Sequence, residues 1–259
     1  MFSKYASAGI LGLLFLACTD PSAPVYNVST NYQLPADSNI YKTINDIPLP
    51  EGFKQKQSPD SNFADWLKNI RLKTDTRVFL YNGQLKNNQS AQFAVLDISV
   101  GDRDLQQCAD AVMRLRAEFL FHEKKYAQIV FTDYEGNDYA FDPPYDRNHF
   151  NSYLFRVFGM CGSASLALML KKSVMDSIAP GDVLIRGGFP GHAAMVMDVA
   201  VNDSGKKIFL LAQSYMPAQD IHLLNNPSNP SLSPWYEVND EPYIKTPEYT
   251  FRNTELMKW

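Results

Sequence analysis

Three strand-like runs lie close together between residues 182 and 215, and they constrain the fold more than any other feature of the chain. They are Asp182 to Ile185, His192 to Val201 and Lys207 to Tyr215. Short apolar runs bounded by glycine-rich or polar turns are typical of strands. We predict that they form a central antiparallel sheet, packed by helices at 102–121 and 162–172. The fold class that this indicates is α+β in a single domain.

The clearest helical pattern covers residues 102–121, with Asp102 and Asp104 in its expected first turn. One face is apolar, which predicts that Cys108 on that face is a buried structural thiol. A second face carries a polar stripe. The stripe consists of Gln107, Asp110, Arg114 and Glu118. Two explanations stay open for it, a solvated face with ion pairs or a face that contacts a ligand.

Shorter patterns predict the remaining elements. Ser61 or Asn62 can cap a short helix that places Trp66 in the core. A second helix is expected around residues 150–158, ended by Gly159. Strands are expected at 78–81, 91–100 and 128–132, with a turn at Asn82-Gly83 after the first. Trp235 and Trp259 could stack on sugars, but packing against the core is the expectation for both.

The N-terminus has the pattern of an export signal. Residues 1–17 place Lys4 before the apolar run Ile10 to Ala17, which is too short to span a bilayer but fits a signal peptide. Cys18 follows Ala17, and this resembles a bacterial lipoprotein signal, which implies acylation of Cys18. Residues 18–46 are polar and are interpreted as a tether before a globular domain at 47–259. The resemblance implies a lipid-anchored protein of the bacterial cell envelope, with its domain outside the cytoplasm.

Residues 159–215 could carry catalytic chemistry. Cys161 stands at an expected helix start, where the positive end of the dipole would stabilise a thiolate and lower the pKa of the thiol. His192 begins a strand and could hold the proton. Gln213 lies on the next strand and could orient the imidazole. Backbone N–H groups near Gly162 would then stabilise an oxyanion.

This ordered set resembles the NlpC/P60 and CHAP modules, which are amidases and peptidases. The matching positions are Cys161, Gly181-Asp182-Val183, Gly191-His192 and Gln213. The resemblance implies a papain-like fold and a thiol amidase or peptidase acting on cell-wall peptides. The competing hypothesis is a non-catalytic envelope lipoprotein that uses the same fold as a binding module for a cell-wall peptide or glycan. A purely structural lipoprotein is a third possibility.

A longer resemblance covers most of the chain after the tether. The matching stretches include Tyr81 to Lys86, Gly101 to Leu120, Pro190 to Ala193, Leu210 to Gln219 and Ser233 to Tyr236. On these stretches the chain is similar to a family of Bacteroidetes lipoproteins catalogued as domain of unknown function 4846. The family supplies no established activity.

Composition and motifs exclude several other classes. Lys and Arg total 24 against 28 Asp and Glu, so no basic excess favours nucleic-acid binding. The four histidines, His122, His149, His192 and His222, lie far apart and form no metal-binding motif. No Walker loop or dinucleotide-binding glycine pattern occurs. We therefore expect neither a metal nor a cofactor.

Overall fold

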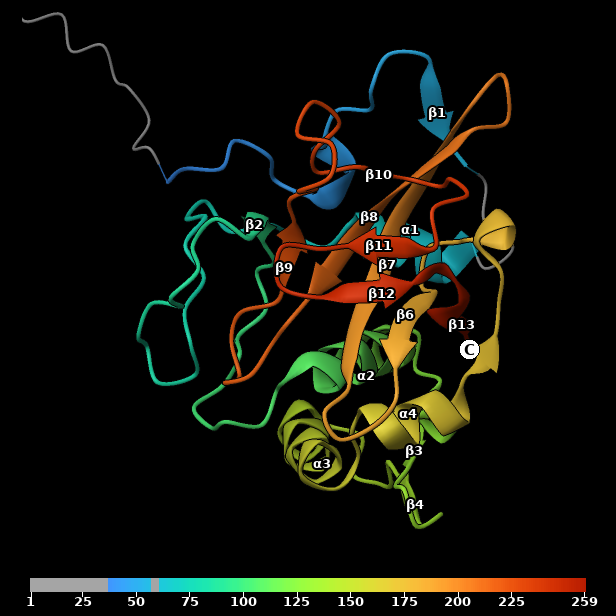
Figure 1. Cartoon of the computed structure of the whole chain (residues 1–259). Helices are drawn as coiled ribbons and strands as arrows, with labels where there is room; N and C mark the ends of the chain where they lie inside the picture. Colours follow the sequence, from blue (N-terminus) through green and yellow to red (C-terminus); the bar gives the residue numbers. More distant parts are fainter. Residues whose placement is uncertain (1–36, 57–60) are drawn as a thin grey trace, which may run out of the picture. The chain divides into compact units, whose positions relative to one another are not determined.

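The computed structural model of the protein describes residues 37–56 and 61–259. The expected signal peptide, the expected acylation site Cys18 and residues 18–36 of the expected tether lie outside these residues. The described part is a mixed α and β domain built on a nine-stranded antiparallel sheet (Figure 1). The predicted α+β class with a central antiparallel sheet is therefore confirmed.

The sheet has a seven-strand path, with two further strands attached to its middle. Its order is β2-β9-β8-β7-β6-β13-β5, while β1 pairs with β7 and β10 pairs with β8. The strands are β1 (Phe53–Gln55), β2 (Gln92–Val95), β5 (Lys171–Lys172), β6 (Val183–Arg186), β7 (His192–Asn202), β8 (Lys207–Gln213), β9 (His222–Leu224), β10 (Tyr236–Glu237) and β13 (Leu256–Lys258). The three strands predicted between 182 and 215 are β6, β7 and β8, and they lie side by side at its centre.

Both faces of the central strands are buried. Side chains alternate along a strand, so neighbouring residues enter opposite layers. Ala193 and Met195 of β7 belong to a core that includes the helices, whereas Ala194 and Val196 belong to a second apolar cluster. The second cluster also contains Phe251 and Leu256 from the C-terminal segment.

Helices cover one face of the sheet and a hairpin covers the other (Figure 1). The helices are α1 (Ser61–Lys68), α2 (Cys108–His122), α3 (Arg147–Met160) and α4 (Ser163–Met169). The hairpin consists of β11 (Tyr243–Lys245) and β12 (Thr250–Arg252), and a further hairpin pairs β3 (Val130–Thr132) with β4 (Asp138–Ala140). Short 3-10 turns are η1 (Ile44–Asp46), η2 (Tyr126–Gln128), η3 (Met175–Ser177) and η4 (Asn253–Glu255). Ile44 is already part of the buried core.

Several predicted boundaries are wrong. The helix expected at 102–121 begins only at Cys108, because the Asp104 carboxylate accepts a hydrogen bond from the distant Ala218 N–H and holds the preceding segment in turns. The strand expected at 91–100 ends at Val95. Residues 78–81 make only isolated bridges, since the Gln89 side chain bonds both backbone groups of Val78.

Cys108 is buried on α2, as the apolar pattern predicts. Trp235 is buried and donates its indole N–H to the Pro48 carbonyl at 3.0 Å. Trp259 is partly buried, with the Arg116 guanidinium 5.5 Å from its ring centre. Core packing is thus the structural role of both tryptophans.

No single helix among the described residues is long and apolar enough to cross a membrane. Taken together α3 and α4 pass the test of length and composition, but they meet at a bend of 102°.

A prediction concerns Gly181, which precedes β6 with φ +91° and would place a Cβ 2.7 Å from the Phe63 ring. Gly181→Ala should lower the free energy of unfolding by about 2–4 kcal/mol, because a left-handed backbone and a ring clash both oppose the methyl group. Gly205→Ala is the matched control: its φ is +83° and nothing lies within 4 Å. It should cost about 1 kcal/mol. Equal losses in urea denaturation would show that the Phe63 contact does not matter.

Candidate functional site

Cys161 lies between two helices and is buried. It follows α3, and its N–H bonds to the Val157 carbonyl at 2.7 Å. The residue is 7% exposed and belongs to the helix-side core. Burial raises the pKa of the Cys161 thiol to about 11, with the nearby Asp133 and Asp110 carboxylates acting in the same direction. The lowered pKa expected for a thiol at a helix start is therefore not found.

The backbone near Cys161 also differs from an oxyanion site. The Gly162 N–H, which the thiol hypothesis assigns to an oxyanion, already donates to the Ser165 hydroxyl at 2.9 Å. Because this donor is used inside the protein, it is not free to stabilise a developing charge.

His192 and Gln213 are brought together. Nε2 of His192 and Oε1 of Gln213 are 2.8 Å apart across the neighbouring strands β7 and β8. His192 is 2% exposed, and its ring lies 4.7 Å from Tyr215 and 4.6 Å from Tyr249 between ring centres. Burial lowers the pKa of His192 to about 4. The imidazole is therefore neutral at pH 7, and Nε2 carries the proton that Oε1 accepts.

Cys161 and His192 lie on opposite faces of the sheet. His192 shares the face of Ala194 and stacks on Phe251 of the second cluster, at 5.6 Å between ring centres. Cys161 packs in the other core, together with Ala193. The structure thus joins two of the three residues that the sequence grouped, and it leaves the sulfur on the far side of β7.

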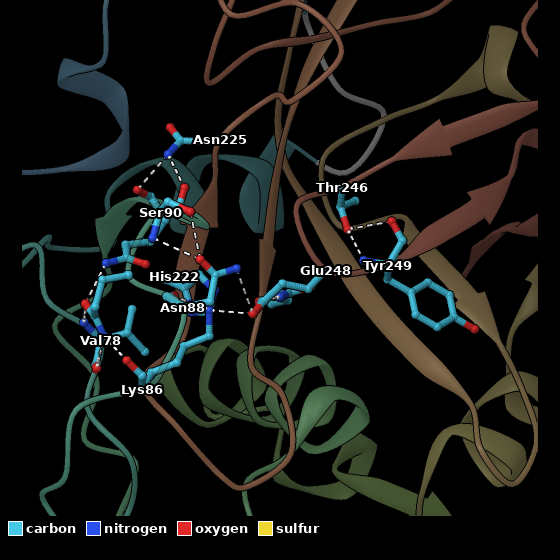
Figure 2. Close-up of polar contacts among 12 residues, drawn as sticks. Val78, Lys86, Asn88, Ser90, His222, Asn225, Thr246, Glu248 and Tyr249 are labelled. Carbon is cyan, nitrogen blue, oxygen red and sulfur yellow. Dashed lines mark hydrogen bonds and ion pairs between the residues drawn. The ribbon is translucent and has the colours of Figure 1, made fainter.

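The His192–Gln213 pair extends into a chain of buried polar contacts. Nε2 of Gln213 donates to Glu248 at 3.0 Å, and Glu248 forms an ion pair with Lys86 at 2.8 Å. Figure 2 shows Glu248 reaching from the loop before β12 towards Lys86 and Asn88. The side chains of Lys86 and Glu248 are only 7% and 15% exposed. These contacts fasten the 78–90 and 246–249 loops to the ends of β7 and β8.

A surface groove lies elsewhere, along α2. Its volume is about 510 Å³, and it runs between α2, the end of α1 and the segment after β2. The lining residues are Trp66, Asn69, Ile70, Arg71, Asp97, Ile98, Ser99, Arg114, Glu118 and His122. Trp66 packs one side of its ring near Phe63 and Phe119 and also forms part of this wall. Trp66 thus packs against core residues, as expected, and also lines the groove.

Arg114 and Glu118 of the polar stripe form the charged wall of the groove. They are only 16% and 15% exposed and form an ion pair with each other at 3.6 Å, so the expected ion pairs of the stripe are present on a largely buried face. Arg114 donates to the Ser99 carbonyl at 2.7 Å and to the Gln106 side chain, and Glu118 pairs with Arg147 of α3 at 2.8 Å. Within the described residues Nε of Arg114 is buried and has no hydrogen-bond partner.

The other charges of the groove come from loops. Arg71 and Asp97 are exposed and lie 3.8 Å apart. The sequence reasoning missed both, since neither belongs to a periodic pattern; Arg114 and Glu118 were recognisable from their i, i+4 spacing. Among the described residues no cluster of His, Cys, Asp and Glu could hold a metal ion.

A prediction concerns the reactivity of Cys161. At neutral pH a thiol-reactive probe should label it as slowly as Cys108, because both thiols are buried and their pKa values are raised. His192→Ala should leave the Cys161 rate unchanged, since the imidazole is on the other face. Mass spectrometry of the labelled peptides separates the two sites. Fast labelling of Cys161 that slows in His192→Ala would contradict this arrangement.

A second prediction concerns pH. The unfolded chain titrates near the ordinary pKa of 6.5, above the value of about 4 for folded His192, so the stability from neutral His192 is complete above about pH 6.5 and is lost as the pH falls towards 4. The stability advantage of the wild type over His192→Asn should therefore shrink by on the order of 2 kcal/mol across that range. Urea denaturation at a series of pH values measures it.

Other buried groups change the free energy of unfolding with pH in the opposite direction, and the comparison with His192→Asn cancels them. Burial raises the pKa values of Asp182 and Asp198 to about 6, so their stabilising contribution is present at low pH and is lost as the pH rises. Both proteins share these groups. A constant difference between the two proteins would show that His192 is not held neutral by burial.

A comparison with models of known protein families identifies a family for this chain. The family model described as domain of unknown function (4846) matches residues 44–143 and 139–258. No curated protein and no solved structure matches the chain. The two matched segments cover the described domain from η1 to β13. The chain therefore belongs to the family of domain of unknown function 4846.

Proposed function

We propose that the chain is a lipoprotein of the bacterial cell envelope whose domain binds a segment of cell-wall peptide or glycan in the α2 groove. One observation carries the proposal: the groove joins an aromatic wall at Trp66 to the fixed, largely buried charges of Arg114 and Glu118. Binding sites combine apolar or aromatic walls with a few fixed polar groups in this way.

The chemistry of the groove fits such a ligand. An indole face packs against the C–H face of a sugar ring or an apolar side chain. A carboxylate accepts hydrogen bonds from hydroxyl and amine groups, and a guanidinium group donates hydrogen bonds to hydroxyl and carboxylate oxygens. Cell-wall peptides carry both amines and carboxylates, and the groove presents both charge signs, Arg71 and Arg114 beside Asp97 and Glu118.

Binding without cleavage is the favoured form of the proposal. A thiol hydrolase needs the sulfur and the imidazole within hydrogen-bond reach, or one water apart. Cys161 and His192 are instead buried in separate layers. His192 also has its Nε2 engaged by Gln213.

The remaining parts of the proposal rest on the sequence. The pattern of Lys4, the apolar run 10–17 and Cys18 supports export and acylation. Two or more acyl chains would hold the protein firmly at the membrane. The chain order of α4, β6, β7 and β8 supports a distant relation to papain-like modules. In this proposal the domain has that fold but does not use the thiol for catalysis.

A binding experiment tests the groove. Soluble cell-wall peptide and glycan fragments are titrated into the chain by calorimetry, and the same titration is made with the double variant Arg71→Gln/Asp97→Asn. Both side chains are exposed, so folding should be unaffected. The variant should bind about tenfold more weakly, because one to two polar contacts are lost. The matched control is Asp75→Asn/Arg77→Gln, an exposed ion pair outside the groove.

Two results would contradict the proposal. In the first, the fragments bind the groove variant and the control equally, which places the site elsewhere. In the second, mass spectrometry detects cleaved fragments with the wild type but not with Cys161→Ser, which restores the thiol hydrolase.

A further inference from the structure

A cluster of large apolar side chains is exposed at the tip of the β6–β7 hairpin. Phe189 is 84% exposed, and two neighbours are also exposed, Leu168 of α4 at 71% and Tyr134 of the β3–β4 turn at 64%. All three line one groove of about 560 Å³, and the Phe189 and Tyr134 rings lie 6.1 Å apart. The hairpin tip lies beside α4 (Figure 1). A monomeric protein in water gains nothing by exposing such a cluster, which indicates an interaction surface.

The same surface is basic in a chain whose net charge is −4. Lys172 and Arg252 line the groove, and Lys171 adjoins it in β5. Within the described part of the chain, no ion pair is formed by any of these three cations. Three acidic residues lie here against the cations Lys171, Lys172, Arg186 and Arg252. Glu255 pairs with Arg186 at 2.7 Å, and Asp133 and Glu135 flank Tyr134. The excess here is positive, so an anionic surface would be attracted to this side.

The hairpin tip carries no polar side chain, and one of its carbonyls is already hydrogen-bonded. Phe189 is flanked by Gly187, Gly188, Pro190 and Gly191, which bring no polar side chains. The Gly188 carbonyl accepts the Ser163 hydroxyl at 3.1 Å. A backbone acceptor that is already satisfied adds no desolvation penalty when the tip enters an apolar medium. Apolar tips ringed by flexible lysines suit the boundary between lipid headgroups and acyl chains better than a flat protein interface.

We propose that this surface, defined by Phe189, Leu168 and Tyr134 with Lys171, Lys172 and Arg252, docks on a bilayer that contains anionic phospholipid. Phe189 and Leu168 enter the interface, and the cations contact the phosphates. The inference goes beyond the proposed function, because it needs neither the groove ligand nor the lipid anchor. With an anchor present, docking would fix how the domain faces the membrane.

Vesicle binding tests the proposal. All proteins carry Cys18→Ser, so that no acyl chain can form, and retain the full chain. Cosedimentation is measured with vesicles of equal parts phosphatidylcholine and phosphatidylglycerol, and with phosphatidylcholine alone. The variants are Phe189→Ser/Leu168→Ser and Lys171→Gln/Lys172→Gln. Ile40→Ser, 66% exposed and outside the surface, is the matched control, and the binding that remains in the patch variants reports the background from the N-terminal segment.

The parent and Ile40→Ser should bind mixed vesicles equally, whereas both patch variants should bind about tenfold more weakly. Binding to phosphatidylcholine alone should be weak, and salt should reduce binding to the mixed vesicles. Phe189→Trp should shift its fluorescence to the blue when mixed vesicles are added. Equal binding by Phe189→Ser/Leu168→Ser and Ile40→Ser would overturn the proposal. So would equal binding of the parent to both kinds of vesicle.

Discussion

Side chains of β7 alternate between two apolar layers from His192 to Met197, before a bulge between Val196 and Asp198 shifts the order, and this alternation decides where the candidate residues lie. From His192 to Ala200 every residue of this strand is buried, so each has to enter one of two apolar layers. That rule places Ala193 against the helices and Ala194 against the β12 side of the sheet. It also separates His192 from Cys161, although both stand near the same end of the sheet. A shift of one residue in register would move each side chain to the opposite layer and would disrupt the packing of both layers.

Burying His192 then requires partners, and the protein supplies them from far along the chain. Gln213 accepts a hydrogen bond from the imidazole N–H, and Glu248 accepts a hydrogen bond from the Gln213 amide. Lys86 forms an ion pair with Glu248. A buried polar chain of this kind is stable only when its members are satisfied together. The polar chain gives the Gly191-His192 motif a structural role, because it connects the 78–90 and 246–249 loops to the sheet. The exposed charges of the groove along α2 are Arg71 and Asp97, whereas Arg114 and Glu118 are largely buried and held by Ser99, Gln106 and Arg147.

The sequence allowed the α+β class, the three central strands and the contact between the strands of His192 and Gln213 to be expected, because these depend on local periodicity and strand order. It could not place Cys161, since the face that a helix start presents depends on how α3 and α4 pack. It also missed Glu248 and Lys86, which meet across 162 positions of chain only after folding. The start of the helix predicted at 102–121 was wrong for the same reason. Asp104 bonds to Ala218, which is distant in sequence, and so lies outside the helix. The α2 stripe was recognised, and the structure contains its expected ion pairs on a largely buried face, but contact with a ligand stays a prediction.

The location of function is the central claim, and a map of ligand contacts tests it most directly. Backbone amide signals of the isotope-labelled chain can be followed by NMR while soluble cell-wall fragments are added. If the ligand binds in the α2 groove, the shifts should concentrate at Trp66, Asp97, Arg114 and Glu118. Shifts centred on Cys161, Gly162 and Ser163, with the groove signals unchanged, would contradict it and would return the chemistry to the thiol.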